Sequence, residues 1–144
     1  MKKVITIIII IVAFVIEIYF SYNYKRLDPN VESVEYMVVM KMKAMLVMDK
    51  VYTEKDKEKI SIILNALKNR TRENNRIRFN TYNYFIDMMV KDKKKGGFIQ
   101  HRYAIWVDKD GKGTYITIAS ISDKSYKLHA DSAILIEKYL AGIN

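Results

Sequence analysis

An almost uninterrupted apolar run near the start of the chain limits what this sequence can fold into. Residues 4–16 contain one polar side chain, Thr6, and three further large apolar residues follow Glu17. Core strands rarely exceed ten residues, whereas residues 4–20 in a helix would extend roughly 25 Å, close to the hydrocarbon thickness of a bilayer. The run therefore predicts a transmembrane helix and not a strand in a soluble core.

The residues around this run indicate a retained anchor. Cleavage of a leader needs small residues after the apolar run, and the only candidate, Ser21, has the bulky Tyr19 two positions before it. Two basic residues precede the run and two come after it, so charge alone does not fix the orientation. A short segment before an early apolar run is typical of a signal anchor that exports the C-terminal part of its chain. We expect residues 1–26 to cross the cell membrane once, with an extracytoplasmic C-terminal domain.

The remaining chain is the length of one domain. Residues 27–33 contain the only proline and are interpreted as a linker, which leaves residues 34–144 for the fold. The absence of cysteine excludes disulfides, thiolate metal sites, a cysteine nucleophile and the acylated cysteine of a lipoprotein. The formal net charge of +9 favours an anionic partner, such as lipid headgroups, an envelope polymer, an acidic protein or nucleic acid.

Apolar periodicity predicts strands and then a helix in the first half of this domain. Residues 34–51 alternate like one long bent strand or a strand pair, with Val34, Tyr36 and Val38 on one face. Residues 54–70 come after Thr53, a candidate N-cap, and have the spacing of an amphipathic helix. Its predicted buried stripe consists of Ile60, Ile63, Leu64 and Leu67.

The second half predicts an antiparallel meander and a closing helix. Strands are expected near residues 82–90, 102–108 and 115–122, separated by turns of sequence DKKKGG and DKDGKG. Asp131 is expected to cap a helix over residues 132–140. The predicted fold class is α+β: N-terminal strand or strands, a helix, a three-strand meander and a C-terminal helix on a largely antiparallel sheet.

Two basic clusters are the candidate binding groups for an anion or a partner. The first consists of Arg70, Arg72, Arg76 and Arg78, and the second of Lys93, Lys94 and Lys95 at a predicted hairpin turn. The planar guanidinium suits phosphate or carboxylate, and lysines on a turn that faces a bilayer would be attracted to an anionic leaflet. The alternative for both clusters is a solvated surface that keeps the domain soluble.

Known catalytic and metal-binding patterns are missing from the sequence. There is no nucleophile elbow, phosphate loop, HExxH motif or dinucleotide fingerprint, and DKDGKG lacks the ligand spacing of a calcium loop. A hydrolase would need His101 or His129 to meet a serine and an acid in space. Met40, Met42 and Met48 are interpreted as packing residues and not as copper ligands. We therefore expect no enzyme activity, cofactor or metal, and an exported domain argues against nucleic acid.

Several segments resemble small uncharacterised extracytoplasmic domains of Gram-positive bacteria. The matching residues are Thr53, Ile60, Ile63 and Leu67 in a capped helix, Tyr103 and Trp106 in a strand, and Tyr126, Lys127 and Leu128 before a final helix. Such domains are often lipoproteins, whereas this chain has no cysteine to acylate. The resemblance implies the architecture and the location, and it brings no active site.

These observations predict a membrane-anchored binding module of a bacterial cell envelope. Its partner would be an envelope protein or an anionic polymer. An alternative is an immunity or inhibitor protein, in which a small basic domain near the membrane neutralises a secreted toxin or hydrolase.

Overall fold

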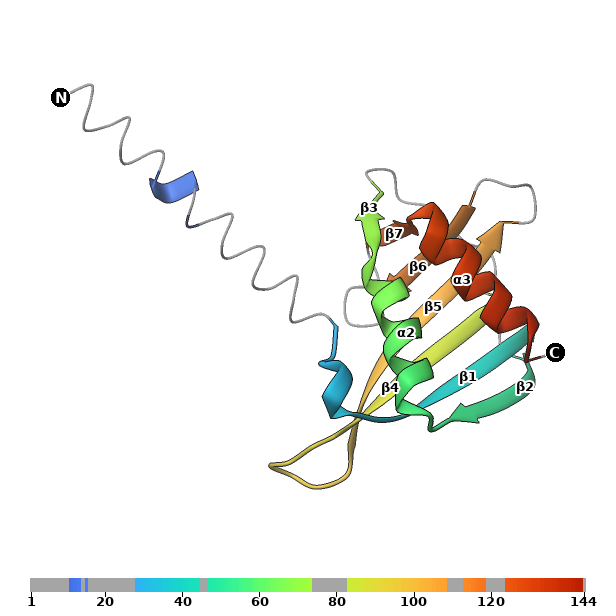
Figure 1. The fold of residues 1–144 in the computed structure, drawn as a ribbon, viewed down its shortest axis with the longest axis horizontal. Helices are drawn as coiled ribbons and strands as arrows, with labels where there is room; N and C mark the ends of the chain where they lie inside the picture. Colours follow the sequence, from blue (N-terminus) through green and yellow to red (C-terminus); the bar gives the residue numbers. More distant parts are fainter. Residues whose placement is uncertain are drawn as a thin grey trace.

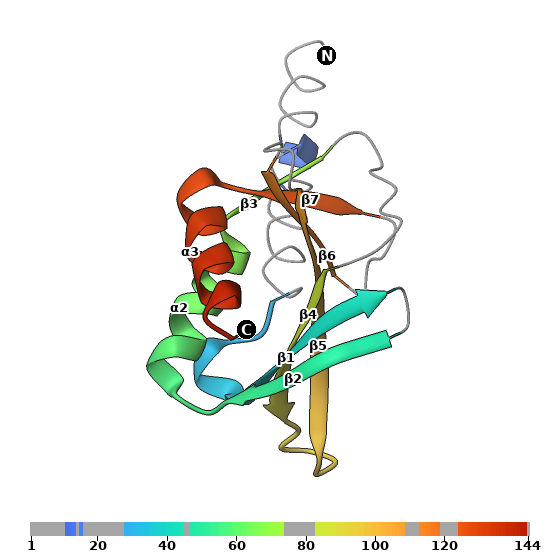
Figure 2. The same ribbon diagram turned by 90° about the vertical axis from the view of Figure 1, so that its right-hand side faces the viewer.

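A single antiparallel sheet with two helices on one face forms the body of the molecule (Figures 1 and 2). The computed structural model describes residues 11–13, 15, 28–44, 47–73, 83–108, 113–118 and 124–143. The elements in chain order are η1 (Val31–Ser33), β1 (Val34–Ala44), β2 (Val47–Glu54), α2 (Lys57–Lys68), β3 (Arg70–Arg72), β4 (Tyr84–Lys91), β5 (Phe98–Asp108), β6 (Gly113–Ile118), β7 (Ser125–Leu128) and α3 (Ala130–Ala141).

The strand order confirms the predicted α+β class. Seven strands pair in the order β2-β1-β4-β5-β6-β7-β3, and every pairing is antiparallel. Strands β2 and β3 are the two edges of the sheet. The helices α2 and α3 pack side by side over one face, as the 90° view in Figure 2 shows.

The N-terminal strands form a pair, and Val34 does not share a face of β1 with Tyr36 and Val38 as predicted. Val34 is buried together with Met37 and Val39, while Tyr36 and Val38 are only partly buried. The pairing of β1 with β4 shifts register between Val34 and Tyr36. A bulge of this kind inserts one extra residue and so exchanges the two faces for the rest of the strand.

Both helices begin at residues other than the predicted caps. Asp56 is the N-cap of α2, where its carboxylate accepts hydrogen bonds from the backbone N–H groups of Glu58 and Lys59. The predicted cap Thr53 lies instead in β2. His129 occupies the N-cap position of α3, and the predicted cap Asp131 lies in the first turn, where a negative charge still favours the helix.

The meander has four strands and not three. Strand β7 covers only four residues, too few for alternation to distinguish it from a turn, and it was not predicted. It pairs with β6 on one side and with the three-residue β3 on the other. Strand β3 comes directly after α2, so the edge of the sheet begins where the helix ends.

The core lies between the helices and the sheet. The predicted stripe of α2 is confirmed, since Ile60, Ile63, Leu64 and Leu67 are all buried. Burying an aliphatic side chain of this size contributes about 1.5–3 kcal/mol. The facing sheet residues are Val34, Met37, Val39, Ile86, Met88, Tyr103, Ile105, Ile116, Ile118, Tyr126 and Leu128, and α3 adds Ala133, Ile136 and Leu140.

The segment before β1 is bound to the domain by a buried ion pair, here called the clamp. The Nη1 and Nη2 atoms of Arg70 donate to the carboxylate of Asp28, at 3.0 and 2.9 Å. The Tyr103 hydroxyl donates to the same carboxylate at 2.6 Å. Arg70 also donates to the carbonyl of Leu67 at 2.7 Å and lies over the ring of Tyr126. Residues 28–33 of the predicted linker are therefore part of the domain surface.

Most of the predicted anchor, residues 1–26, lies outside the described residues. Residues 11–13 and 15 are helical and exposed. Among the helices that the structure describes, none is long and apolar enough to cross a membrane.

Candidate functional site

Arg70, the first residue of the predicted arginine cluster, has a structural position. Its side chain is fully buried, and that of Asp28 is only 8% exposed. The anion that Arg70 binds is therefore a carboxylate of its own chain. Burial of Tyr103, together with the negative charge of Asp28, raises the pKa of that phenol well above its ordinary value, so it stays protonated and donates to Asp28. An external anion has no access to this guanidinium.

Arg72 does not share the buried position of Arg70. Arg72 is exposed on the edge strand β3, two residues after Arg70. Arg76 and Arg78 lie outside the described residues.

Lys93, Lys94 and Lys95 lie together at the tip of the β4–β5 hairpin. All three are exposed, and the sequence correctly predicted a turn at this place. Arg72 belongs to the last strand at one edge of the sheet, whereas these lysines lie beyond the ends of two inner strands. Arg72 and the three lysines therefore belong to different parts of the surface.

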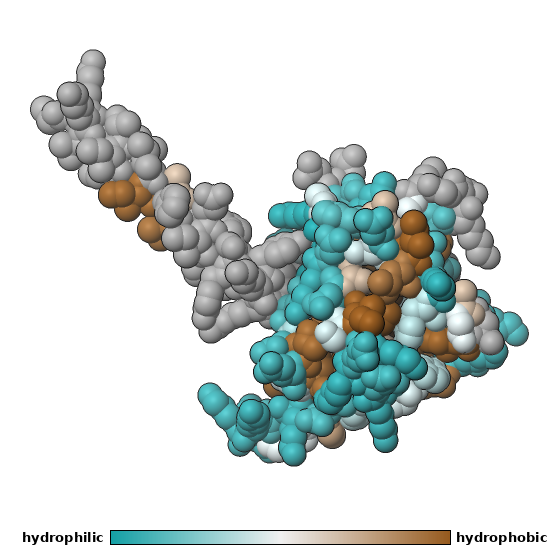
Figure 3. Space-filling view, viewed as in Figure 1, coloured by the Kyte–Doolittle hydropathy of each residue, from teal (hydrophilic) through white to brown (hydrophobic). Residues whose placement is uncertain are grey.

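A further hollow lies elsewhere, between the two helices and the end of β2. This α2–α3 groove has a volume of about 550 Å³. Its lining consists of Tyr52, Glu54, Lys59, Ile62, Ile63, Leu135, Lys138, Tyr139, Gly142 and Ile143. Ile62 and Leu135 are 45% and 36% exposed. The space-filling view shows apolar surface gathered over the helices between hydrophilic margins (Figure 3).

A buried carboxylate orders the polar wall of the groove. Glu54 accepts hydrogen bonds from the backbone N–H groups of Lys55 and Asp56, both at 3.0 Å, and from the Tyr52 hydroxyl at 3.2 Å. The Lys59 ammonium lies 3.6 Å from it. Burial alone would raise the pKa of the Glu54 carboxyl, but the hydrogen bonds from Asp56 and Tyr52 and the charge of Lys59 together hold that pKa below its usual value. The carboxylate is therefore ionised and fixed in place at neutral pH.

The hydroxyl of Tyr139 is a polar group of the groove wall that the fold leaves unsatisfied. It is buried and has no hydrogen-bond partner among the described residues. Burial and the nearby Glu54 charge raise the pKa of this phenol, so the hydroxyl keeps its proton. A buried donor without an acceptor costs about 1–3 kcal/mol. The groove thus combines exposed aliphatic side chains with an unpaired donor.

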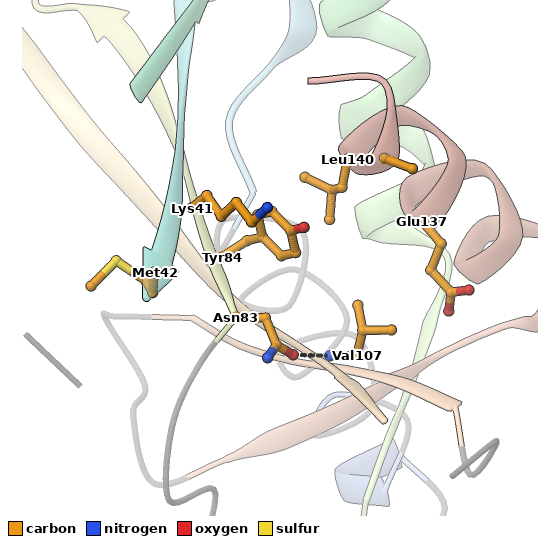
Figure 4. Close-up of a pocket in the computed structure, with 8 residues that line it drawn as sticks. Lys41, Met42, Asn83, Tyr84, Val107, Glu137 and Leu140 are labelled. Carbon is orange, nitrogen blue, oxygen red and sulfur yellow. Dashed lines mark hydrogen bonds between the residues drawn. The ribbon is translucent and has the colours of Figure 1, made fainter. Parts of the chain in front are cut away.

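A second hollow of about 360 Å³ lies between the sheet and the end of α3 (Figure 4). Lys41 and Tyr84 lie on its sheet side, facing Leu140 and Glu137 of the helix. Its polar groups have partners within the fold: the carbonyl oxygen of the Asn83 side chain accepts from the backbone N–H of Val107 at 2.7 Å, and Glu137 accepts from the Thr114 hydroxyl. This arrangement supports the packing of α3 and leaves less for a ligand than the α2–α3 groove.

The two histidines, the candidate bases of a hydrolase, lie in different parts of the fold. The Nε2 atom of His129 lies 2.8 Å from the Thr71 hydroxyl oxygen, an exposed contact between the N-cap of α3 and the sheet edge. His101 lies on β5 opposite Met88. Across the described ranges, no three His, Asp or Glu side chains are grouped so that they could hold a metal ion.

The α2–α3 groove was not predicted from the sequence, although a signal was present. Each helix carries more large apolar residues than its buried stripe uses: Ile62 in α2, and Ile134 and Leu135 in α3. An amphipathic helix with one covered face is expected to place polar residues at such positions. The surplus residues mark the exposed apolar surface, but only the packing of α2 on α3 shows that Ile62 and Leu135 share one hollow.

Comparison with known proteins gives no relative for this chain. No family model matches it, and neither the search of curated proteins nor that of solved structures finds a match. The resemblance to Gram-positive extracytoplasmic domains stays a prediction.

Proposed function

We propose that this chain is a membrane-anchored binding module of a bacterial cell envelope. Residues 1–26 hold it in the membrane, the domain lies on the extracytoplasmic side, and the α2–α3 groove binds a protein partner. The module performs no chemistry of its own. The observation that carries this proposal is the groove itself.

The lining of the groove indicates the kind of partner. Its volume of about 550 Å³ is that of a site for a few side chains or one small molecule. Exposed Ile62 and Leu135 would bury aliphatic side chains of the partner, while Lys59 and Lys138 at the groove would attract its acidic groups. An apolar segment of a protein with neighbouring carboxylates fits this pattern, and the positive charge of the whole chain acts in the same direction.

The location in the proposal rests on the sequence. The apolar run of residues 4–16 is too long and too apolar for a surface element, and no small residues suitable for cleavage come after it. Anchoring would keep the groove close to the membrane, where secreted and envelope proteins pass. Neutralisation of a secreted toxin or hydrolase would be one form of this binding, favoured if the lysines of the groove meet an acidic active-site cleft.

Site-specific photocrosslinking in intact cells tests the groove. A photoreactive amino acid replaces Leu135 in the full chain, and the matched control replaces its neighbour Ile134, which is 65% exposed but is not part of the groove lining. The proposal predicts a discrete crosslinked protein from position 135 and not from position 134. It also predicts that Ile62→Asp on the opposite wall removes that product.

Two results would contradict the proposal. Equal products from positions 134 and 135 would mean that exposed apolar residues of α3 are contacted without regard to the groove. A product from position 135 that survives Ile62→Asp would place the partner outside the hollow.

A further inference from the structure

We infer that the tip of the β4–β5 hairpin is a second membrane contact, which docks on the surface of an anionic bilayer. The inference rests on the anchoring part of the proposed function and adds an orientation to it. The hairpin tip comprises residues 91–99, and its ligand is the headgroup region of the lipid leaflet.

The backbone of the tip directs its positive charge outward. The carboxylate of Asp92 accepts from the backbone N–H groups of Lys94 and Lys95, at 2.8 and 3.2 Å. The backbone N–H of Asp92 donates to the carbonyl of Gly97 at 3.0 Å, which closes the turn. Gly96 and Gly97 have φ values of +71° and +80°, the left-handed region that glycine adopts without strain. The single acidic side chain is therefore used within the turn.

The lysines of the tip are combined with exposed apolar side chains. Residues 91–99 hold four lysines and one aspartate, and residues 93–99 are all exposed. Phe98 is 51% exposed and Ile99 is 47% exposed. The ring of Tyr36, in β1, packs edge-on against the ring of Phe98, with ring centres 5.3 Å apart, and so supports the Phe98 side chain.

This combination favours a bilayer over a soluble polyanion. An anionic wall polymer would be attracted by the lysines alone and would gain little from Phe98 and Ile99, and a nucleic acid could stack on Phe98 but would leave Ile99 uncovered. A bilayer interface accommodates both, because lysines interact with anionic headgroups while aromatic and aliphatic groups enter the boundary of the acyl region. Glu32 and Glu35 are exposed on η1 and at the start of β1, outside the hairpin tip, so the attraction to anionic headgroups has to come from the lysines of the tip.

The fold places the base of the hairpin at the end of the sheet where β1 begins. Val34, the first residue of β1, pairs with Val90, and Val90 pairs with Ile99 at the base of the tip. The clamp between Asp28 and Arg70 holds the segment before β1 against the domain. In Figure 1 the segment 28–33 and the hairpin lie on the left of the domain, and the C-terminus lies on the right.

Lipid quenching of a probe on the hairpin tests the inference. The full chain, which lacks native cysteine, is reconstituted with Ile99→Cys carrying an environment-sensitive dye. Vesicles contain either phosphatidylglycerol with phosphatidylcholine or phosphatidylcholine alone, each with a brominated lipid as quencher. The matched probe is at Lys50→Cys, which is exposed and pairs with Lys41 toward the opposite end of β1.

The inference predicts a blue shift and quenching at position 99 in anionic vesicles, a smaller effect in neutral vesicles, and neither effect at position 50. Replacing Lys93, Lys94 and Lys95 by Gln should reduce the quenching at position 99. Replacing the exposed residues Lys43, Lys50 and Lys55 by Gln should leave the quenching at position 99 unchanged.

The failures can be distinguished from one another. An unquenched probe at position 99 in a chain that resists extraction from anionic vesicles would overturn the hairpin contact and leave the anchor intact. A chain that does not stay with the vesicles at all would overturn the anchor, and the hairpin contact with it. Equal quenching at positions 99 and 50 would overturn the orientation.

Discussion

The clamp and the α2–α3 groove are both built around a buried carboxylate, and they differ in what the fold leaves available. In the clamp, the carboxylate of Asp28 receives Arg70 and the Tyr103 hydroxyl, and no solvent reaches the guanidinium. In the groove, Glu54 is similarly satisfied, but exposed aliphatic side chains line the same hollow, and the buried Tyr139 hydroxyl has no acceptor among the described residues. The clamp is closed to a partner, and the groove is open to one.

This difference separates a basic residue that stabilises the fold from a surface that can bind. A buried carboxylate paired with a guanidinium and a phenol holds the segment before β1 in one position. Exposed apolar surface is instead stabilised when a bound partner covers it. Substitutions in the two regions test this difference. Their expected effects on the free energy of unfolding range from large in the clamp to small at the groove rim.

The largest effect is expected from breaking the clamp. Arg70→Met leaves the Asp28 carboxylate buried without its counter-charge, and we expect a loss of about 3–5 kcal/mol in the free energy of unfolding. Urea unfolding of the full chain in detergent measures it. The control is Arg72→Met, on the same strand but exposed, which should change the value by less than about 0.5 kcal/mol. Equal losses in the two variants would mean that the clamp adds nothing beyond strand packing.

An intermediate effect is expected at Glu54 and depends on pH. Because the pKa of this carboxyl is lowered in the folded state, its stabilising contribution is present above the unfolded pKa and is lost as the pH falls through the folded pKa. Glu54→Gln should therefore cost about 1.5–3 kcal/mol at pH 7, where it removes a charged acceptor. The difference between variant and parent should shrink in strong acid. A difference that stays constant from neutral pH into strong acid would exclude this assignment.

A small gain in stability is expected from Tyr139→Phe. The change removes a buried hydroxyl that has no partner among the described residues and keeps the ring, so the free energy of unfolding should stay the same or rise by about 1 kcal/mol. The crosslinked product from position 135 should weaken if the hydroxyl serves the partner. A clear loss of stability would show that the hydroxyl has an acceptor in solution.

The smallest effect on stability is expected at the groove rim. Leu135→Asp and its control Ile134→Asp both place a carboxylate at an exposed position of α3, and each should change the free energy of unfolding by less than about 0.5 kcal/mol. Partner binding should be lost only in Leu135→Asp. Parallel loss in both variants would remove the groove from the account.

The sequence predicted the part of the fold that depends on long periodic segments. The buried stripe of α2 agrees with the spacing, and the strand expected near residues 82–90 is present as β4. The prediction for the face of β1 after Val34 was wrong. A bulge there changes the alternation of the strand, and no glycine or proline in the sequence marks it. The short strands β3 and β7 were missed because three or four residues carry too little pattern.

The candidate site was less predictable, for a physical reason. Arg70 and Lys94 are alike in the sequence as members of basic clusters, but one is buried against Asp28 and the other is exposed on a turn. That distinction depends on a contact between residues 42 positions apart, which local sequence does not encode. The groove likewise requires residues of α2 and α3 to meet across the helical layer.

Labelling of Lys50→Cys in intact cells tests the central claim most directly. That claim is that the domain lies on the extracytoplasmic side of the cell membrane. The chain has no other cysteine, and position 50 is exposed on the edge strand β2. A membrane-impermeant maleimide should label the variant in intact cells as fully as after lysis. Labelling that occurs only after lysis would place the domain in the cytoplasm and would contradict the proposed function.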